Sequence, residues 1–381
     1  MDMVAGRAWA DERRPVRHID WVLAAVVVAL TSVGLVLLHS ISATVPDEAA
    51  FWLVRIMKQG ATAGVGLIIV VVICSFDYRF FKVYAGFIYL ASLAALVLVK
   101  IPGIGATDPS GVAQRWFSIA GIQITPSEIT KLCVIVMLAA VLSQIRTPEP
   151  TLSDVVKALA VAVVPLVLVF IQPDIGTSIV IAAITVGMLI VAGTRLRHLL
   201  ILSVVGVLLI GLAFQLNVIQ DFQVQRLTAF LDRANAPEDA RYNLDQSLVA
   251  VGSGGLFGRG YLQGTQTNLD YVPRQHTDFI FTAAGEQFGF VGAMFILLLY
   301  ALILWRAIRI AALAKDPFGT LVAAGIASMF AIQMFVNIGM VIGIMPITGI
   351  PLPFLSYGGS SILVSFAAIG MLESIHMRRF T

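Results

Sequence analysis

The sequence has little charge and almost no cysteine. Only 12% of its 381 residues are Asp, Glu, Lys or Arg, whereas soluble domains carry about 25%. Hydrophobic residues make up 59% of the chain and the mean hydropathy is +0.92. A water-soluble fold is therefore excluded. The two cysteines, Cys74 and Cys133, lie in or at the end of apolar runs, so we expect packed thiols, not a disulfide or a metal site.

Long apolar runs recur along nearly the whole chain. A helix needs about 20 apolar residues to cross the hydrocarbon core of a bilayer. The first run is too long for the core of a signal peptide, which predicts a retained first helix. We expect an all-α integral membrane protein, a single polytopic domain over residues 1–381 with about ten transmembrane helices, at 20–43, 51–74, 79–99, 126–145, 153–170, 174–193, 198–218, 278–308, 317–345 and 352–376.

The positive charges separate the hydrophobic runs instead of forming one face. This distribution argues against nucleic-acid binding, although the net charge is +3 and basic patches neutralise phosphates. Basic residues are retained on the cytoplasmic side of short loops. Segment 1–19 and both termini are therefore expected in the cytoplasm, with the other basic connections, which hold Arg79, Lys82, Arg146, Lys157, Arg195, Arg197, Arg306, Arg309, Lys315, Arg378 and Arg379.

The segment 219–277, between the seventh and eighth spans, is then a large extracytoplasmic loop. It is too long for a plain connector between packed helices, which predicts a functional role. Stretches near 222–232 and 242–251 are expected to form short amphipathic helices at the membrane surface. The glycine-rich run 252–264 predicts tight turns, since glycine adopts positive φ freely.

The fourth span opens with Thr125, Pro126, Ser127 and Glu128, followed by Lys131. One interpretation is structural: Thr at the N-cap, Pro at N1 and Glu at N3 form a capping box, and Glu128 pairs with Lys131. The other is functional, because ionisable groups inside a membrane helix are costly and mark cavities. Both interpretations stay open for Glu128. The functional interpretation is favoured for Lys131, which lies deeper in the span.

His276, Thr277 and Asp278 begin the eighth span, with Glu286 eight residues further on. Asp278 is either a helix cap that uses the helix dipole or a functional carboxylate. The glycine-rich loop before it favours the second, because it would deliver the carboxylate to the outer mouth of the bundle. There it could act as a base on a hydroxyl nucleophile.

Several cations lie near the expected outer face. Arg55 and Lys58 share a face of the second span, where their side chains either extend to the interface or bind a ligand. The outer connections hold further arginines, each of which could equally be solvated. Together these cations could bind a pyrophosphate, whose oxygens arginine matches with two hydrogen bonds; those in the connections are Arg115, Arg241, Arg259 and Arg274.

The segment 346–361, PITGIPLPFLSYGGSS, concentrates prolines and glycines before the last span. Helix breakers at membrane depth are tolerated only where the backbone is buried in protein or lines a watery cavity. This predicts a re-entrant or cavity-lining turn. Between the fifth and sixth spans, Asp174 of the QPDIGT segment is expected to be an N-cap.

These segments resemble the SEDS family (shape, elongation, division and sporulation) of bacterial peptidoglycan glycosyltransferases. The resemblance lies in PSEITK at 126–131, QPDIGTS at 172–178, SLVAVGSGGLFGRG at 247–260, GTQ at 264–266, HTDFIF at 276–281 and NIGMVIGIMPITGIPLPFLSYGGSS at 337–361. GIPLPFLSYGGSS and QPDIGTS are more similar to the elongation branch than to the division branch. Thr125 replaces the Gln that usually precedes PSE, and Gln287 replaces a frequent second acidic residue, so no paired role is assigned to 286–287.

The resemblance implies an enzyme of the bacterial inner membrane that polymerises lipid II, an undecaprenyl pyrophosphate, on the outer face. Its implied partners are a class B penicillin-binding protein and other membrane proteins of the elongation complex. Asp278 would be the catalytic residue, and a divalent cation (Mg or Mn) could assist. The substrate-binding candidates are Glu128, Lys131, Arg55, Lys58, Arg115, Arg241, Arg259, His276, Thr277, Ser356 and Tyr357.

Two other functions compete with this one. A lipid II flippase would also use a broken helix and intramembrane charge, but the sequence has no internal repeat and its charges gather toward the outer mouth. A non-catalytic scaffold of the elongation machinery would recruit enzymes without needing Asp278.

Overall fold

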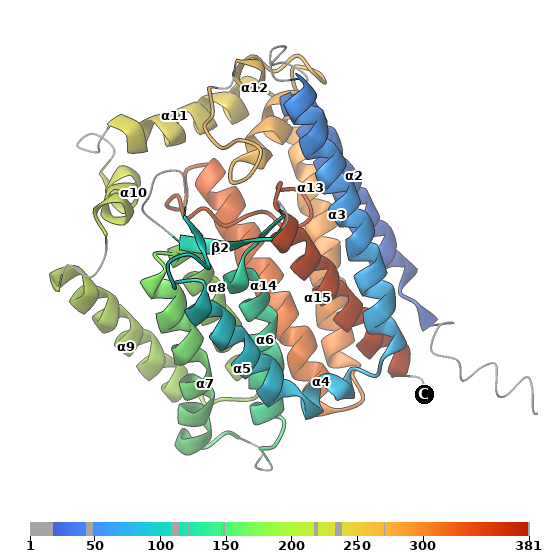
Figure 1. Ribbon diagram of the computed structural model, residues 1–381, viewed down its shortest axis with the longest axis vertical. Coiled ribbons are helices and arrows are strands. Elements are labelled where there is room, and N and C mark those ends of the chain that lie inside the picture. The colour runs from blue at the N-terminus through green and yellow to red at the C-terminus, as the bar shows by residue number, and fades with distance from the viewer. Residues whose placement is uncertain are drawn as a thin grey trace, which may run out of the picture.

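The computed structural model is a bundle of long helices with shorter helices and a small sheet at one end (Figure 1). The structure describes residues 18–42, 49–107, 114–119, 122–145, 147, 149–216, 220–232, 238–269 and 271–379. The predicted cytoplasmic segment 1–19 lies mostly outside these residues, as does Arg146. The expectation of a mostly helical polytopic membrane protein is confirmed.

Among the residues that the structure describes, seven helices are long and apolar enough to cross a membrane. They are α2 (Trp21–Ser42), Leu53–Ser75 of α3 (Ala49–Ser75), α7 (Leu152–Ile171), α9 (Leu196–Gln215), α13 (Ile280–Ala312), α14 (Pro317–Val341) and α15 (Gly359–Arg378). Three of the predicted spans correspond to shorter helices, namely α5 (Ala85–Leu98), α6 (Pro126–Leu142) and α8 (Ile175–Val191). The count of ten spans therefore stays a prediction.

Two predicted spans have different boundaries in the structure. The span 79–99 is divided into α4 (Arg79–Val83) and α5, which meet at Tyr84. The last predicted span, 352–376, begins as a helix only at Gly359, because 346–358 is not helical. This second difference agrees with the turn that the prolines and glycines of this segment predicted.

The helices α14 and α15 form the centre of the bundle. Of their apolar stretches, 72% and 89% of the residues are buried, and α14 packs against α13, α8 and α6. By contrast, α9 has no buried residue and stands at the edge of the bundle in Figure 1. Apolar side chains that do not pack against protein are stable in lipid, which fits a membrane-spanning role for this helix.

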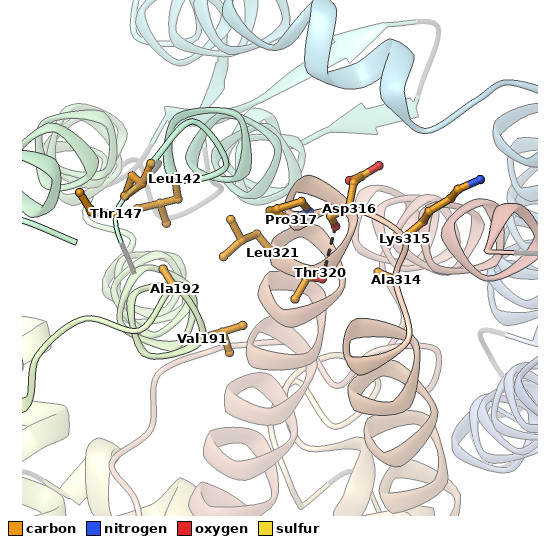
Figure 2. A pocket seen from close by; sticks show the side chains of 11 residues that line it. Leu142, Thr147, Val191, Ala192, Ala314, Lys315, Asp316, Pro317, Thr320 and Leu321 are labelled. Atoms are coloured by element: carbon orange, nitrogen blue, oxygen red, sulfur yellow. Dashed lines mark hydrogen bonds between the residues drawn. The ribbon is translucent and has the colours of Figure 1, made fainter. Parts of the chain in front are cut away.

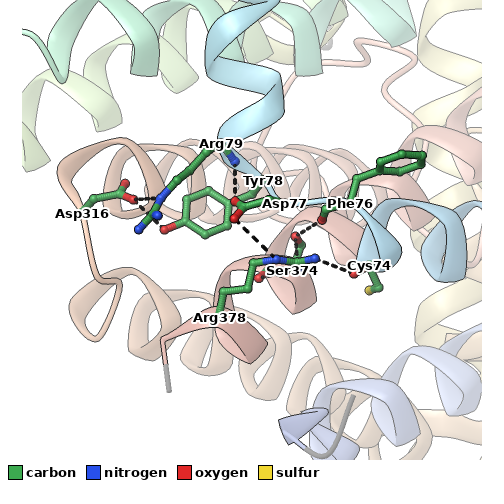
Figure 3. Close-up of polar contacts among 8 residues, drawn as sticks. All are labelled: Cys74, Phe76, Asp77, Tyr78, Arg79, Asp316, Ser374 and Arg378. Atoms are coloured by element: carbon green, nitrogen blue, oxygen red, sulfur yellow. Dashed lines mark hydrogen bonds and ion pairs between the residues drawn. The ribbon is translucent and has the colours of Figure 1, made fainter. Parts of the chain in front are cut away.

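Polar contacts connect α3, α14 and α15 at one end of the bundle (Figure 3). Tyr78 donates its hydroxyl proton to Asp316 Oδ2 at 2.6 Å, and Arg79 Nε donates to the same oxygen at 3.1 Å. Asp316 is the N-cap of α14, where its Oδ1 accepts the Gly319 N–H. Arg378 of α15 donates to the Cys74 carbonyl at 3.0 Å. The start of α14 is thereby held to the neighbouring helices.

The opposite end of α14 carries structure that the sequence only partly predicted. The connection after α5 contains three antiparallel strands, β1 (Ala106–Thr107), β2 (Gln114–Ile119) and β3 (Ile122–Ile124), which the all-helical prediction missed. The segment 219–277 contains α10 (Asp221–Leu231), α11 (Glu238–Ser253) and α12 (Thr265–Asn268). The helices expected near 222–232 and 242–251 are thus present, and Figure 1 shows all three over this end of the bundle.

Candidate active site

Asp278 lies two residues before α13, at the end of a turn that starts near residue 272. Its N–H donates to the Arg274 carbonyl at 3.1 Å, and its own carbonyl accepts Asn337 Nδ2 of α14 at 2.8 Å. The N-cap position of α13 belongs to Phe279 and has no side-chain cap. The interpretation of Asp278 as a helix cap is therefore wrong, because the helix begins one residue too late for it.

The Asp278 carboxylate lies beside Arg226 of α10, over the bare backbone of Gly349. A Cβ built on Gly349 would lie 3.4 Å from Asp278 Oδ2 and 3.9 Å from Arg226 Nη1. Gly349 also has φ +73°, a conformation that L side chains rarely adopt. Glycine in this turn thus lets the backbone approach the carboxylate and the guanidinium together.

The pKa of Asp278 reflects opposing influences. Burial raises this pKa above its ordinary value, while the charges of Arg274 and Arg226 lower it and the charge of Asp174 raises it further. Burial disfavours the carboxylate, and nearby cations favour it. Because the burial effect is larger, the pKa of Asp278 is raised overall, and a raised pKa makes a carboxylate a stronger base.

Four arginines surround this turn. Besides Arg226 and Arg274, Arg115 acts electrostatically on Arg226, and Arg55 of α3 acts on His276. Arg115 is positioned by the Gln172 and Pro173 carbonyls, to which it donates at 2.9 and 2.6 Å. Clustered cations of this kind match the charge of a pyrophosphate. Three of the arginines predicted from sequence to lie near the outer face, Arg55, Arg115 and Arg274, are therefore close to this turn.

His276 and Tyr357 join the turn before α13 to the segment 346–358. The Tyr357 N–H donates to the His276 carbonyl at 2.9 Å, and the two rings lie 6.0 Å apart. Burial, with the charges of Arg55 and Arg274, lowers the pKa of His276 to about 4. This histidine is therefore neutral near pH 7. Thr277 donates its hydroxyl proton to the Arg274 carbonyl at 3.2 Å.

Ser356 has a structural role inside the same segment. It is 3% exposed, and its hydroxyl oxygen accepts the Leu352 N–H at 2.8 Å. Its carbonyl accepts Gln59 Nε2 of α3 at 3.1 Å. Its buried side chain thus holds the turn in shape, which does not support the substrate contact expected from the sequence.

Glu128 and Lys131 form a buried ion pair at the start of α6. Lys131 Nζ lies 2.8 Å from Glu128 Oε1, and Lys131 is 1% exposed. Thr125 makes no side-chain cap, so the capping-box interpretation is wrong; its N–H instead donates to Ser360 Oγ of α15. Within the described part of the chain, Glu128 Oε2 is buried without a hydrogen-bond partner. A pair with an unsatisfied oxygen indicates a polar cavity.

Asp174 connects the start of α6 with the Asp278 region. Its Oδ1 accepts the Thr177 N–H at 3.1 Å, which confirms the predicted N-cap of α8. Its Oδ2 accepts the Ser127 hydroxyl at 3.1 Å, next to Glu128. Because the charge of Asp174 also raises the pKa of Asp278, both predicted motifs contribute to one electrostatic environment.

Other predicted residues lie on α3 or have contacts within the segment 219–277. Arg241 lies 3.6 Å from Asp245 on an exposed face of α11. Arg259 donates to the Ser253 carbonyl and to Thr265 Oγ1. Lys58 is exposed on α3. These contacts do not place the three cations at Asp278.

Glu286, on the first half of α13, holds α12 in place. Its carboxylate accepts the Gln266 N–H at 2.8 Å, the Thr267 N–H at 2.9 Å and the Thr267 hydroxyl at 2.7 Å. The adjacent Gln287 accepts the Ser40 hydroxyl of α2 at 2.8 Å. These contacts give Glu286 and Gln287 structural roles.

Arg226 was missed by reasoning from the sequence. It lies within the predicted amphipathic helix 222–232, but its position depends on Asp278 and Gly349, which lie 52 and 123 residues further along the chain. The only local signal was a cation on a short polar helix.

The described residues contain no group of three or more His, Cys, Asp or Glu side chains that could hold a metal ion. Around Asp278 the neighbours are mainly arginines. This set of side chains does not form a metal cage of the usual carboxylate type. We therefore assign no reaction step to the divalent cation that the resemblance suggested.

A separate hollow lies at the other end of α14 (Figure 2). Its volume is about 440 Å³, and it is lined by the ends of α6 and α8 and the start of α14. Figure 2 shows Lys315 turned away from the apolar side chains of Leu142, Val191 and Leu321. Because Asp278 contacts α14 near its far end, through Asn337, this hollow is not part of the candidate site.

Comparison with known proteins identifies the family. Residues 20–380 match the cell cycle protein family of FtsW, RodA and SpoVE. The chain therefore belongs to this family, the SEDS proteins. It is similar to stage V sporulation protein E of Bacillus subtilis, with 36% identity over 361 residues that cover 93% of this chain and 96% of the relative.

Two further similarities bear on function. Peptidoglycan glycosyltransferase MrdB of Escherichia coli K12 is 38% identical over 319 residues, which cover 82% of this chain and 83% of the relative. A structure described as "Structural coordination of polymerization and crosslinking by a peptidoglycan synthase complex" is similar with a TM-score of 0.80 and 28% identity, covering 95% of this chain and 98% of the other. The chain is a multi-pass bacterial membrane protein.

Proposed function

We propose that this protein is a peptidoglycan glycosyltransferase that polymerises lipid II at the outer membrane face, with Asp278 as general base. The observation that carries the proposal is the Asp278 carboxylate beside Arg226 over Gly349. Such a site offers a base for a sugar hydroxyl and cations for a pyrophosphate within one small region. The relative named a peptidoglycan glycosyltransferase supports the same reaction.

The reaction is a single displacement. Asp278 takes the proton of the C4 hydroxyl of the acceptor N-acetylglucosamine, whose oxygen attacks C1 of the donor N-acetylmuramic acid. The C1–O bond to undecaprenyl pyrophosphate breaks, and the pyrophosphate departs with the electron pair. An α-linked donor gives a β-linked product, so one base suffices and no enzyme nucleophile is needed, in contrast to retaining glycosidases.

The arginines stabilise the departing pyrophosphate. Arg226 and Arg274 lie close enough to affect the pKa of Asp278, and Arg115 affects Arg226. Fixed cations that neutralise developing charge need no reorganisation during the reaction. Glu128 and Lys131 form a second polar group, next to Ser127, whose hydroxyl donates to Asp174.

The test is Asp278→Asn, assayed with purified protein and its partner in detergent with fluorescent lipid II. We expect no glycan ladder, with unchanged elution and thermal unfolding. The matched control is Asp245→Asn, which removes an exposed carboxylate on α11 and should leave the ladder intact. Because detergent provides no leaflets to flip between, ladders cannot arise from a flippase. Polymerisation that survives Asp278→Asn sinks the proposal.

We also propose that the protein acts in cell elongation with a class B penicillin-binding protein and other elongation-complex membrane proteins. The motif similarity to the elongation branch supports the role, and the similarity to a polymerisation and crosslinking complex supports the partner. The proposal includes both termini in the cytoplasm, an orientation that the basic connections between spans support. Copurification with the partner, and protease accessibility of tags on each terminus, test these assignments.

A further inference from the structure

The helix α13 is interrupted at Gly289, where the outer loop binds to its backbone. Gly289 has φ 66° and ψ −162°, far from helical values. The N–H groups of Phe290 and Val291 donate to the carbonyls of Gly255 and Leu256 at 2.9 and 3.0 Å. Across the break, the carbonyls of Glu286 and Gln287 accept the N–H groups of Arg259 and Gly260 at 2.9 and 3.1 Å. The loop thus satisfies the backbone groups that the break exposes.

Two glycines make this approach possible. A Cβ on Gly258 would lie 2.1 Å from the Gln287 carbonyl oxygen, and a Cβ on Gly289 would lie 2.2 Å from the Gly258 nitrogen. Gly258 also has φ +80°. On its other side the loop contacts α2, where the Tyr261 hydroxyl lies 2.7 Å from His39 Nδ1. These contacts hold the loop against α13 and α2 at the height of the break.

The exposure of α13 changes at this break. Residues 280–287 and Gly289 are all buried. Beyond the break an exposed apolar stripe begins, in which residues recur every three or four positions: Phe290, Val291, Met294, Phe295, Leu298, Trp305 and Ile308. From Phe290 to the end of α13 is about 35 Å at 1.5 Å per residue, enough for a hydrocarbon core of roughly 30 Å. The part of α13 from the break to its end is therefore long enough to span the bilayer by itself.

The ends of the stripe carry the residues typical of membrane interfaces. Trp305 lies near one end, with the guanidinium groups of Arg306 and Arg309 5.4 and 5.6 Å from its ring. At the other end the loop adds Leu256 and Phe257, which are 65% and 80% exposed. Trp and Tyr concentrate at both boundaries of a membrane, whereas Lys and Arg are retained on the cytoplasmic side, so we assign the Trp305 end to the cytoplasmic boundary and the loop to the outer one. The exposed loop side chains therefore continue the lipid-facing surface of α13.

We propose that Leu256 and Phe257 insert into the outer leaflet, so that this loop is a lipid anchor attached to the break in α13. The partner is phospholipid near its glycerol region, because the loop meets α13 where its lipid-facing stripe begins. The inference is independent of the glycosyltransferase reaction, since no residue in it takes part in the proposed chemistry.

The test measures the depth of a fluorescent label at residue 257. Phe257→Cys is made in a background with Cys74→Ser and Cys133→Ala, labelled with an environment-sensitive dye, and reconstituted in phospholipid nanodiscs. Two reference labels use the same background: Val204→Cys on α9, whose residues are all unburied, and Arg241→Cys on α11. Recovery of the Val204 and Arg241 labels at their expected depths confirms that the background folds.

We expect lipids with a nitroxide near the glycerol region to quench the label at 257 several-fold more than the label at 241. Aqueous iodide should show the reverse order. A label at 257 that iodide quenches as strongly as the label at 241 overturns the proposal. Protection from both quenchers also overturns it, because the side chain would then pack against protein.

Discussion

Asn337 connects the turn that carries Asp278 to the turn before α15, and its replacement by leucine is the most informative test of the proposed site. Its Nδ2 donates to the carbonyls of Asp278 at 2.8 Å and Ile350 at 2.7 Å, and the side chain is 0% exposed. Leaving a buried carbonyl without its donor costs about 1–3 kcal/mol. Asn337 Oδ1 is itself buried without a partner among the described residues, so its removal offsets part of the loss.

We therefore expect Asn337→Leu to destabilise the protein by about 2–4 kcal/mol. The variant should also lower the turnover of lipid II more than it raises KM. The substitution displaces Asp278, the proposed base, but leaves most of the proposed substrate-binding surface in place. Thermal unfolding in detergent gives the first quantity, and the initial rate of glycan formation at varied lipid II gives the second. Both are measured below the unfolding temperature of the variant.

Gln333→Leu is the matched control for this prediction. Gln333 lies one turn earlier on α14, is 2% exposed, and has an Oε1 without a hydrogen-bond partner in the described structure. We expect less destabilisation and nearly normal turnover. Equal effects of the two substitutions would refute the role of Asn337 in positioning Asp278.

Two further predictions concern titratable groups. Arg226→Gln removes a cation that lowers the pKa of Asp278, so the acidic limb of the pH–rate profile should move to higher pH, while Arg241→Gln should leave it in place; a limb that moves to lower pH contradicts the assignment. For Asp316, burial raises the pKa, but the hydrogen bonds from Tyr78 and other donors outweigh burial and hold this pKa below its ordinary value. Its stabilisation is therefore present at neutral pH and lost as the pH falls through that lowered value. Asp316→Asn keeps an N-cap acceptor but removes the charge that Arg79 and Tyr78 meet, so it should cost up to about 1 kcal/mol near neutral pH; thermal unfolding that shows the same loss at acidic pH would rule this out.

The sequence predicted that the protein lies in a lipid bilayer, that it is helical and where its main motifs are, because these properties depend on local composition. Twenty apolar residues in a row predict a membrane helix wherever they occur, and Asp174 before a helix predicts an N-cap. The sequence could not locate the first turn of α13, since a one-residue difference between Asp278 and Phe279 depends on tertiary contacts with Asn337. The small sheet after α5 was missed because its strands are two to six residues long.

The candidate site was predictable in its centre but not in its neighbours. Asp278, Arg55 and Arg115 were named from motif and position, and the structure brings them into one region. Arg226 was not named, and Arg241 and Arg259 were named but have other contacts, because helix periodicity says nothing about which distant turn a helix will face. Ser356 was named as a substrate contact because of its motif, but its hydroxyl oxygen accepts a hydrogen bond from Leu352 within its own turn.

The positions of Asp278 and the outer loop depend on each other through the first half of α13. This short helical segment begins after Asp278 and ends at the break at Gly289, where the loop binds its backbone. Glu286 within it also holds α12. A side chain at Gly258 would push the loop away from the break and leave its carbonyls and N–H groups unpaired. Such a change should therefore disturb the base at a distance, without touching the arginines around it.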